Sequence, residues 1–349
     1  MVRTKIAFLY SEVAGYFLAA AGALSNHVDV LIIRWPVNNE APFDCSRFKE
    51  LKIEDKSTYD RTSLRNRLQD FEPDIVVCSG WMDKDYLAVV KQLKGDVKKV
   101  LTMDNHWTGH WRQRVASFLS PFILKKHFTH AWVPGEPQAK FARKLGFKKI
   151  LTGFYCADTS LFKTKFDATF QGKEKVFPKR FLFVARYVEH KGIFELWNAF
   201  IELANENPEM EWELWCLGTG DQWENRIEHG KIKHFGFVQP NEMDEYIAKT
   251  GVYILPSKFE PWGVSVQEFA IAGFPLLLSE AVGSKEVFLK DNGWSFDIES
   301  KTALKEVMSR VMKLGEKELM DLARKSHDIG MTYTSENWAT KLLELGHEK

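Results

Sequence analysis

The stretch LPSKFEPWGVSVQEFAIAGFPLLLSEAVGSKEVF, residues 255–288, decides how the second half of this chain folds. The apolar run Val252–Leu255 meets a proline, a helix is predicted between Gly263 and Gly273, and the apolar Leu276–Leu278 follows. Glycine and proline punctuate these runs, and short apolar runs that alternate with a helix are typical of a parallel α/β sheet. The stretch therefore predicts a strand, a turn, a helix and a second strand.

Two carboxylates lie around the predicted helix start. Glu260 precedes it and Glu268 follows it, with seven residues between them. The first turn of a helix presents free backbone N–H groups, which bind anions. Carboxylates accept hydrogen bonds from hydroxyl groups. The combination predicts a site for a ligand that carries phosphate and hydroxyl groups, such as an activated sugar.

The composition excludes several classes of protein. With 349 residues, 45% hydrophobic and 27% charged, the chain has the length of about two globular domains. No apolar run approaches the ~18 residues of a spanning helix, and the start MVRTKIAFLYSE reads as a first strand rather than a signal peptide. The four cysteines form no CxxC pair, which argues against a metal cage or a disulfide framework. These features predict a reduced, cytoplasmic protein.

Charge is unevenly distributed, although the formal net charge is only +1. Residues 1–164 contain 25 Lys and Arg against 17 Asp and Glu, and the remainder contains 23 against 30. A positive half suggests an anionic partner, and a membrane surface or a phosphorylated lipid fits. Ordinary solvated faces explain the same count equally well.

The first half opens with a strand, a helix and a strand, predicted at Lys5–Tyr10, Tyr16–Leu24 and Val28–Ile33. Gly15 stands at the first strand-to-helix turn, where ligands of open α/β sheets bind. Further strands are predicted at 74–78, 99–103 and 131–133, and segment 38–56 is polar and irregular. Segment 153–178 reads as a linker, after which a second α/β series begins at Arg180.

One predicted helix of the first half mixes basic and apolar side chains. The segment Trp111–Phe128 contains Arg112, Arg114, Lys125 and Lys126 among several Phe, Leu and Ile residues. Such a mixture is typical of a helix that lies on a membrane surface. A partly buried helix with solvated lysines explains it as well.

Charged residues and glycines of the second half follow predicted strands. Arg186 and Lys191 follow the strand at 180–185, and Gly218-Thr219-Gly220 follows the strand at 212–217. Because parallel strands end at one edge of a sheet, these groups are expected to converge with the glutamate stretch. A guanidinium and an ammonium both bind phosphate. Lacking a third glycine, the Gly218 turn argues against a nicotinamide site.

Four segments, FVARYVEHKG, LGTGD, FGFV and PSKFEPWGVSVQEFAIAGFP, resemble the retaining glycosyltransferases of family 4, or glycosyl transferases group 1. The resemblance is strong over Phe181–Phe288 and weaker over the first half. It implies the GT-B fold, an α/β architecture of two Rossmann-like domains facing across a cleft. Ala185 stands where members of this family often carry glycine.

The resemblance also implies roles for individual residues. Arg186 and Lys191 would bind the donor diphosphate, and Glu268 would hold the ribose hydroxyls. Glu260 would face the transferred sugar, and the Phe237 backbone would meet the base. The remaining residues expected in the donor pocket are Gly218, Gly263, Val264 and Ser265.

The active-centre residue of the first half stays open. Family members end the strand at 99–103 with a histidine or an aspartate, and this chain offers Asp104, which the register favours, and His106. A structural role is the alternative for His106, and a zinc site with His110 is disfavoured because no HExxH pattern joins them. Gly15 and Tyr16 are expected at the acceptor or phosphate loop.

We expect residues 1–160 and a C-terminal helix at 332–349 to form an acceptor-binding domain, and residues 175–331 to form a nucleotide-sugar donor-binding domain. The predicted reaction moves a hexosyl group, with retention and without a metal or other cofactor, from a UDP- or GDP-sugar to a saccharide or lipid-linked saccharide. Cell-surface polysaccharide synthesis is the expected setting, in the cytoplasm or at the inner membrane face, with peripheral contact with an anionic membrane and no nucleic acid. The alternatives are a nucleotide-sugar epimerase or hydrolase of the same fold, or a non-catalytic nucleotide-sugar-binding homologue.

Overall fold

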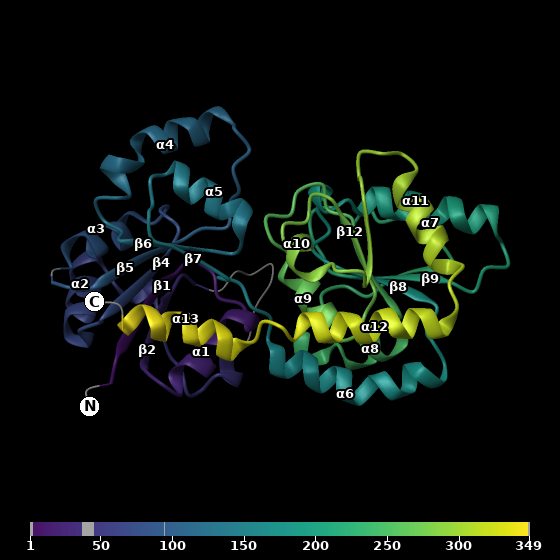
Figure 1. Ribbon diagram of the computed structural model, residues 1–349, viewed down its shortest axis with the longest axis horizontal. Coiled ribbons are helices and arrows are strands. Elements are labelled where there is room, and N and C mark those ends of the chain that lie inside the picture. The colour runs from purple at the N-terminus through teal and green to yellow at the C-terminus, as the bar shows by residue number, and fades with distance from the viewer. Residues whose placement is uncertain (1–2, 37–44, 94, 348–349) are drawn as a thin grey trace. The chain divides into compact units, whose positions relative to one another are not determined.

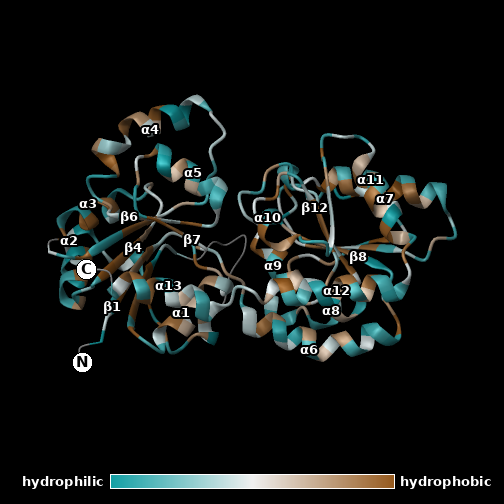
Figure 2. Cartoon of the chain, viewed as in Figure 1, coloured by the Kyte–Doolittle hydropathy of each residue, from teal (hydrophilic) through white to brown (hydrophobic). Residues whose placement is uncertain are grey.

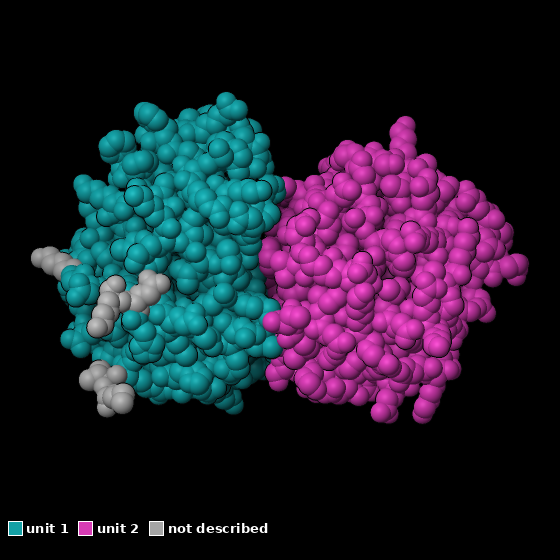
Figure 3. All heavy atoms as spheres, viewed as in Figure 1, with its two compact units in different colours: residues 1–158, 333–349 teal, residues 159–332 magenta. Residues whose placement is uncertain are grey.

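The computed structural model describes residues 3–36, 45–93 and 95–347. The chain divides into two compact units, residues 1–158 with 333–349 and residues 159–332 (Figure 3). Each unit is built on one parallel β-sheet with helices packed against it (Figure 1). No helix among these residues has the length and apolarity needed to cross a membrane.

Seven strands form the sheet of the first unit in the order β3-β2-β1-β4-β5-β6-β7. The strands are β1 (Lys5–Tyr10), β2 (Asp29–Arg34), β3 (Lys52–Asp55), β4 (Ile75–Ser79), β5 (Lys98–Thr102), β6 (His130–Val133) and β7 (Ile150–Thr152). The helices are α1 (Gly15–Ser25), α2 (Arg61–Phe71), α3 (Lys84–Gln92), α4 (Trp111–Ile123), α5 (Glu136–Lys144) and α13 (Ser335–His347).

The central strand β1 is apolar throughout because both of its faces are covered. Ile6 and Phe8 belong to a core that includes residues of α1 and α13. Ala7 and Leu9 belong to a second core with residues of α2, α3 and α5. Successive strand residues point to opposite faces, so one apolar run supplies both cores.

The final helix α13 belongs to the first unit, although it follows the whole second unit in sequence. Its Trp338 is 1% exposed, and the ring centroid lies 4.8 Å from that of Trp132 and 6.0 Å from that of Phe8. The indole N–H donates to the carbonyl oxygen of Phe154 at 2.6 Å. A buried tryptophan with its polar atom satisfied anchors the C-terminal helix.

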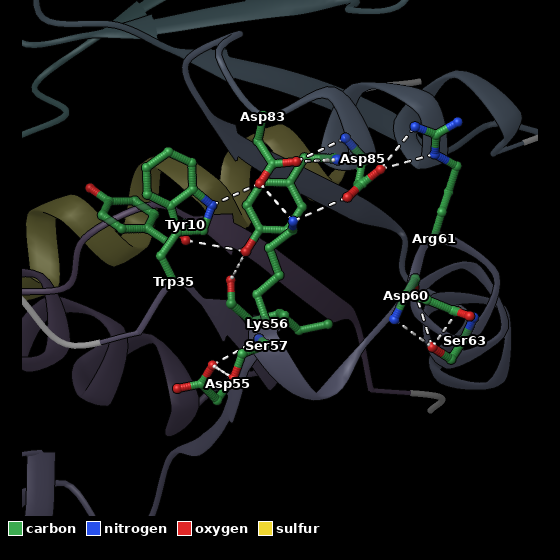
Figure 4. Close-up of polar contacts among 12 residues, drawn as sticks. Tyr10, Trp35, Asp55, Lys56, Ser57, Asp60, Arg61, Ser63, Asp83 and Asp85 are labelled. Carbon is green, nitrogen blue, oxygen red and sulfur yellow. Dashed lines mark hydrogen bonds and ion pairs between the residues drawn. The ribbon is translucent and has the colours of Figure 1, made fainter.

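A polar network joins the loops that follow β2, β3 and β4 (Figure 4). The Lys56 ammonium lies 3.1 Å from a carboxylate oxygen of Asp83 and 3.2 Å from one of Asp85. The Trp35 indole N–H donates to Asp83 at 2.7 Å. Asp83 also caps α3 by accepting from the backbone N–H groups of Asp85 and Tyr86. One aspartate therefore ties the start of α3 to two strand-end loops.

Six strands form the sheet of the second unit in the order β10-β9-β8-β11-β12-β13. The strands are β8 (Arg180–Val184), β9 (Glu213–Leu217), β10 (Ile232–His234), β11 (Val252–Leu255), β12 (Leu276–Ser279) and β13 (Gly293–Phe296). The helices are α6 (Thr159–Lys175), α7 (Ile193–Glu206), α8 (Asp244–Lys249), α9 (Val264–Ile271), α10 (Lys285–Phe288), α11 (Ala303–Met312) and α12 (Glu316–Gly330).

The predicted linker at 153–178 is wrong, because α6 fills most of it. Phe162, Lys165 and Phe170 lie on the buried side of this helix, and two lysines at buried positions had hidden the apolar spacing. The Lys165 ammonium is satisfied by Asp244 at 2.7 Å. Lys173 lies 3.7 Å from the ring centroid of Phe274, and burial lowers the pKa of Lys173 well below its usual value.

Two short strands at the edges of the first sheet, β3 and β7, were not predicted from the sequence. Strand β3, with the sequence KIED, lies within the predicted irregular segment 38–56, of which residues 38–44 fall outside the described part. It is recognisable only from its pairing with β2. Strand β7 has three residues and pairs with β6. Such short strands carry too few side chains for a period-two pattern to emerge.

Candidate functional site

Loops that follow three neighbouring strands meet at the carboxyl edge of the second sheet. Strand β8 lies between β9 and β11. Arg186 lies in the loop after β8, Gly218 in the loop after β9 and Glu260 in the loop after β11. Since the three strands are parallel, their carboxyl ends lie at the same edge. The structure thus brings to one edge the groups that the sequence distributes over 75 residues.

Two glycines let the backbones of these loops touch. A Cβ atom on Gly192, which has φ 70°, would lie 1.9 Å from the carbonyl oxygen of Pro256. A Cβ atom on Gly218, which has φ 140°, would lie 1.9 Å from that of Ala185. Any other residue would push the loops apart. Gly218, expected in the donor pocket, therefore has a role in positioning the loop that carries Arg186.

A buried ion pair joins the loops after β8 and β11. Lys191 ends the short 3₁₀ turn Glu189–Lys191, and its ammonium donates to Oε2 of Glu260. The two side chains are only 16% and 11% exposed. Charges removed from water are stable only when paired, so each holds the other in place. The pair sets a fixed ammonium at the sheet edge.

The N-terminus of α9 lies beside this pair. Gly263 precedes the helix with φ 86°, and no side chain caps the backbone N–H groups of the first turn, which begins with Val264 and Ser265. A Cβ atom on Gly263 would lie 3.1 Å from Cγ of Glu260. Uncapped N–H groups and a nearby ammonium form an arrangement that binds anions.

The charges of the two predicted glutamates both raise the pKa of one tyrosine, Tyr253. The Tyr253 hydroxyl donates to Oγ of Ser265 at 2.8 Å. Burial raises the pKa of Tyr253, and the charges of Glu260 and Glu268 raise it further. Both carboxylates therefore lie within electrostatic reach of the same phenol. Tyr253 is a residue of β11 that the sequence analysis did not single out, since it reads as an ordinary core position.

Two exposed side chains border the same edge. Among the described residues, none forms a hydrogen bond or ion pair with the Arg186 side chain, which is exposed. The pKa of His190 is lowered, mainly by partial desolvation and then by the positive charges of Lys191 and Arg186. Phe237 is 45% exposed and follows Gly236, whose carbonyl accepts from the Gly218 N–H at 2.7 Å. The edge therefore combines a positive field with an exposed aromatic side chain.

Asp104 joins a cluster of tyrosines in the first unit. It follows β5, and its Oδ2 accepts from the Tyr155 hydroxyl at 3.2 Å. The rings of Tyr155 and Tyr16 meet edge to face, with centroids 5.7 Å apart. Burial raises the pKa of Tyr155, as do Tyr16 and Asp104. Gly15 is the first residue of α1, next to Tyr16. Tyr155 was not predicted as a site residue because it lies in the segment 153–178, which was predicted to be a linker.

His106 lies in a different pocket. A cavity of about 410 Å³ is lined by His106 and Trp107 together with four residues of α5, Pro137, Lys140, Arg143 and Lys144. The His110 ring accepts from the Arg112 backbone N–H at 3.4 Å, at the start of α4. Within the described residues, no group of three or more His, Cys, Asp or Glu side chains is arranged to hold a metal ion. The two active-centre candidates thus have different surroundings: Asp104 accepts a hydrogen bond from the tyrosine cluster, and His106 lines the cavity beside α5.

Residues 165–327 match the family model described as glycosyl transferases group 1. The match lies within the second unit and contains the edge built by Arg186, Lys191 and Glu260. This match confirms, for the second unit, the resemblance found in the sequence.

Known proteins resemble the chain at low identity. The 2-deoxystreptamine N-acetyl-D-glucosaminyltransferase of Niallia circulans is 28% identical over 131 residues, which is 33% of this chain and 33% of that protein. The chain thus aligns with about a third of this relative's length. Sucrose-phosphate synthase from Thermosynechococcus elongatus has a TM-score of 0.71 at 15% identity, with 98% of each chain covered. Anabaena Alr3699/HepE in complex with UDP and glucose has a TM-score of 0.72 at 13% identity, with 98% of this chain and 99% of that chain covered. These structures establish that the fold is GT-B.

Proposed function

We propose that this chain is a retaining, metal-independent hexosyltransferase that moves a hexosyl group from a UDP- or GDP-sugar to a saccharide or lipid-linked saccharide. The observation that carries the proposal is the buried Lys191–Glu260 pair beside the uncapped N-terminus of α9, within a segment of glycosyl transferases group 1. The Niallia relative is named a glycosyltransferase, and the Anabaena structure contains UDP and glucose. Both support a nucleotide-sugar donor.

The donor diphosphate would occupy the positive edge. Arg186 supplies an exposed guanidinium that forks onto phosphate oxygens, and Lys191 supplies an ammonium already oriented by Glu260. The N–H groups of Gly263, Val264 and Ser265 add positive partial charge. As the bond to the sugar breaks, negative charge develops on the diphosphate. These fixed groups stabilise it in the role that a metal ion fills elsewhere.

The two glutamates would bind different parts of the donor. Glu260 pairs with Lys191 through Oε2, and its other carboxylate oxygen would face the transferred sugar. Glu268 lies just over one turn into α9 and would hold the ribose hydroxyls. The base meets the backbone at Phe237.

Asp104 would bind the acceptor in the first unit. Its carboxylate accepts from Tyr155, and Tyr16 offers a neighbouring aromatic surface for a sugar ring. In a retaining reaction of this kind, the leaving phosphate accepts the acceptor's proton. Asp104 then acts by orienting the acceptor hydroxyl rather than by removing its proton. We place the reaction in cell-surface polysaccharide synthesis at the inner membrane face.

The test is a donor screen with product analysis. The protein is incubated with UDP- and GDP-sugars, with and without saccharide acceptors, and with or without EDTA. The proposal expects transfer only with an acceptor, an unchanged rate in EDTA, and retained anomeric configuration by NMR. Donor consumption without an acceptor indicates the epimerase or hydrolase. Binding without turnover indicates the non-catalytic homologue.

A matched pair of variants locates the site. Arg186→Ala removes one phosphate ligand and is expected to reduce transfer by about 10²–10³-fold. Arg324→Ala removes an exposed arginine of the same unit, which pairs with Glu174, and is expected to leave transfer unchanged. Equal rates for the two variants would refute the phosphate assignment.

A further inference from the structure

Helix α4 of the first unit is amphipathic, but its large apolar side chains point to the outside. Its side chains Trp111, Phe118 and Phe122 are 62%, 76% and 72% exposed. Val115, Leu119 and Ile123 are 48%, 39% and 47% exposed. Half of the large hydrophobic residues found exposed in the described part of the chain lie on this helix. Figure 2 shows α4 in a mixture of apolar and polar colours.

The protein-facing side of α4 is small or polar. Ser120 is the one buried residue of the helix, and its hydroxyl donates to the carbonyl of Leu145 at 2.7 Å. The Gln113 amide donates to the carbonyl of His106 at 2.7 Å, and Ala116 packs against the core. A surface helix normally buries its large apolar residues and exposes its polar ones. Here the order is reversed, so packing of the unit does not explain the aromatic residues.

The apolar residues share one face. Trp111, Val115, Phe118 and Phe122 are spaced by four, three and four residues, the spacing that places side chains on one side of a helix. The helix has 13 residues and is therefore about 20 Å long. It is too short to span a bilayer but suited to lie in the plane of its surface.

The stretch of sequence that contains α4 carries charge of one sign. Residues 105–135 contain no Asp or Glu, and they contain Arg112, Arg114, Lys125 and Lys126. A second copy packed on this face by two-fold symmetry would bring those cations against one another. Anionic lipid headgroups would neutralise them.

We propose that α4 is a membrane-docking helix, with its apolar face inserted into the headgroup region of a bilayer that contains anionic lipids. The biological purpose of this docking, access to a lipid-linked acceptor, rests on the proposed function. The docking itself is measured without donor or acceptor, so it stands or falls separately from catalysis. His110 opens α4, and the loop before it leads back to Asp104 and the pocket of His106. Docking would therefore bring the acceptor region close to the lipid surface.

The experiment is co-sedimentation of the full chain with vesicles. Vesicles of phosphatidylcholine and phosphatidylglycerol in equal parts are compared with phosphatidylcholine alone, over a series of salt concentrations. We expect binding to the anionic vesicles that weakens as salt rises. The double variant Phe118→Asp/Phe122→Asp should lower the partition coefficient by about tenfold or more. Both side chains are exposed, so the fold is expected to survive, which an unchanged thermal midpoint verifies.

The matched control is Val176→Asp in the second unit. Val176 is 74% exposed, as much as the two phenylalanines, and its replacement should leave vesicle binding unchanged. Equal losses in the control and the double variant would refute docking through α4, as would failure of the full chain to bind anionic vesicles. A concentration-dependent dimer that Phe118→Asp/Phe122→Asp dissolves would instead assign this face to self-association and overturn the proposal.

Discussion

The two sheets have the same kind of parallel topology, but different groups lie at their carboxyl edges. In the second unit, glycines bring backbones into contact and a buried ion pair fixes the charge at Lys191 and Glu260. In the first unit, Asp104 accepts a hydrogen bond from Tyr155, whose ring packs against that of Tyr16. We infer that the arrangement in the second unit suits the diphosphate, the part of the ligand that all donors share. In the first unit, recognition depends on side chains that can vary with the acceptor.

The sharpest consequence concerns the ion pair of the second unit. Lys191→Met should reduce transfer by about 10²–10³-fold, because the ammonium that meets the diphosphate is lost. It should also lower the free energy of unfolding by about 3 kcal/mol, because Glu260 is left buried without its partner. Steady-state kinetics and urea unfolding measure the two effects.

A double variant separates catalysis from stability. Glu260→Gln added to Lys191→Met removes the unpaired charge, so it should restore part of the stability while transfer stays lost. The control is Lys305→Ala, whose ammonium pairs with the exposed Glu202 and Glu206 and which should alter neither property appreciably. Recovery of transfer in the double variant would contradict the role given to Lys191.

The first unit tests the choice between two active-centre candidates. Asp104→Asn should reduce transfer by about 10²-fold, since the carboxylate that orients the acceptor becomes a neutral amide. His106→Ala should change turnover little, because His106 lies in the separate cavity with Trp107 and Lys140. Rates of both variants, at saturating donor, decide between them. A larger loss for His106→Ala would reverse the assignment.

The sequence allowed more to be predicted for the second unit than for the first. Arg186, Lys191 and the glutamates are charged groups placed by strand ends and glycines, and short-range patterns capture such features. Tyr155 and Tyr253 depend on which strands become neighbours, which no local pattern records. Likewise α6 was hidden by buried lysines whose partners, such as Asp244, lie far away in sequence. For α4 the sequence left open whether the apolar side faces the core or the outside, since periodicity does not say which side meets the core.

A smaller effect is expected when the tyrosine cluster is weakened without removing Asp104. Tyr155→Phe deletes the hydroxyl that donates to Oδ2 of Asp104. A hydrogen bond to a charged group contributes about 1.5 kcal/mol, so transfer should fall by roughly tenfold. Tyr246→Phe, at an aromatic contact with Trp215 and Phe235 in the second unit, is the control and should leave the rate unchanged. If both variants behave alike, Tyr155 does not orient Asp104.

The most delicate prediction uses His190 as a reporter of the donor edge. Partial desolvation, then the charges of Lys191 and Arg186, hold the pKa of His190 below its usual value of 6.5. A bound diphosphate would add negative charge beside those cations, so binding of UDP or GDP should raise the pKa of His190. Histidine NMR titrations with and without nucleotide measure this, and the His190→Gln spectrum assigns the resonance.

The sign of the effect on stability follows from the same shift. Because the pKa of His190 is lower in the folded than in the unfolded chain, the unfolded chain binds more protons as the pH falls through about 6.5. The contribution of His190 to stability is therefore present above that pH and is lost below it. Arg186→Ala removes one of the depressing charges, so it should raise the pKa of His190 in the free protein and diminish the rise on adding UDP. If UDP binds and leaves the pKa of His190 unchanged in the unmodified protein, the diphosphate does not sit beside Arg186 and Lys191.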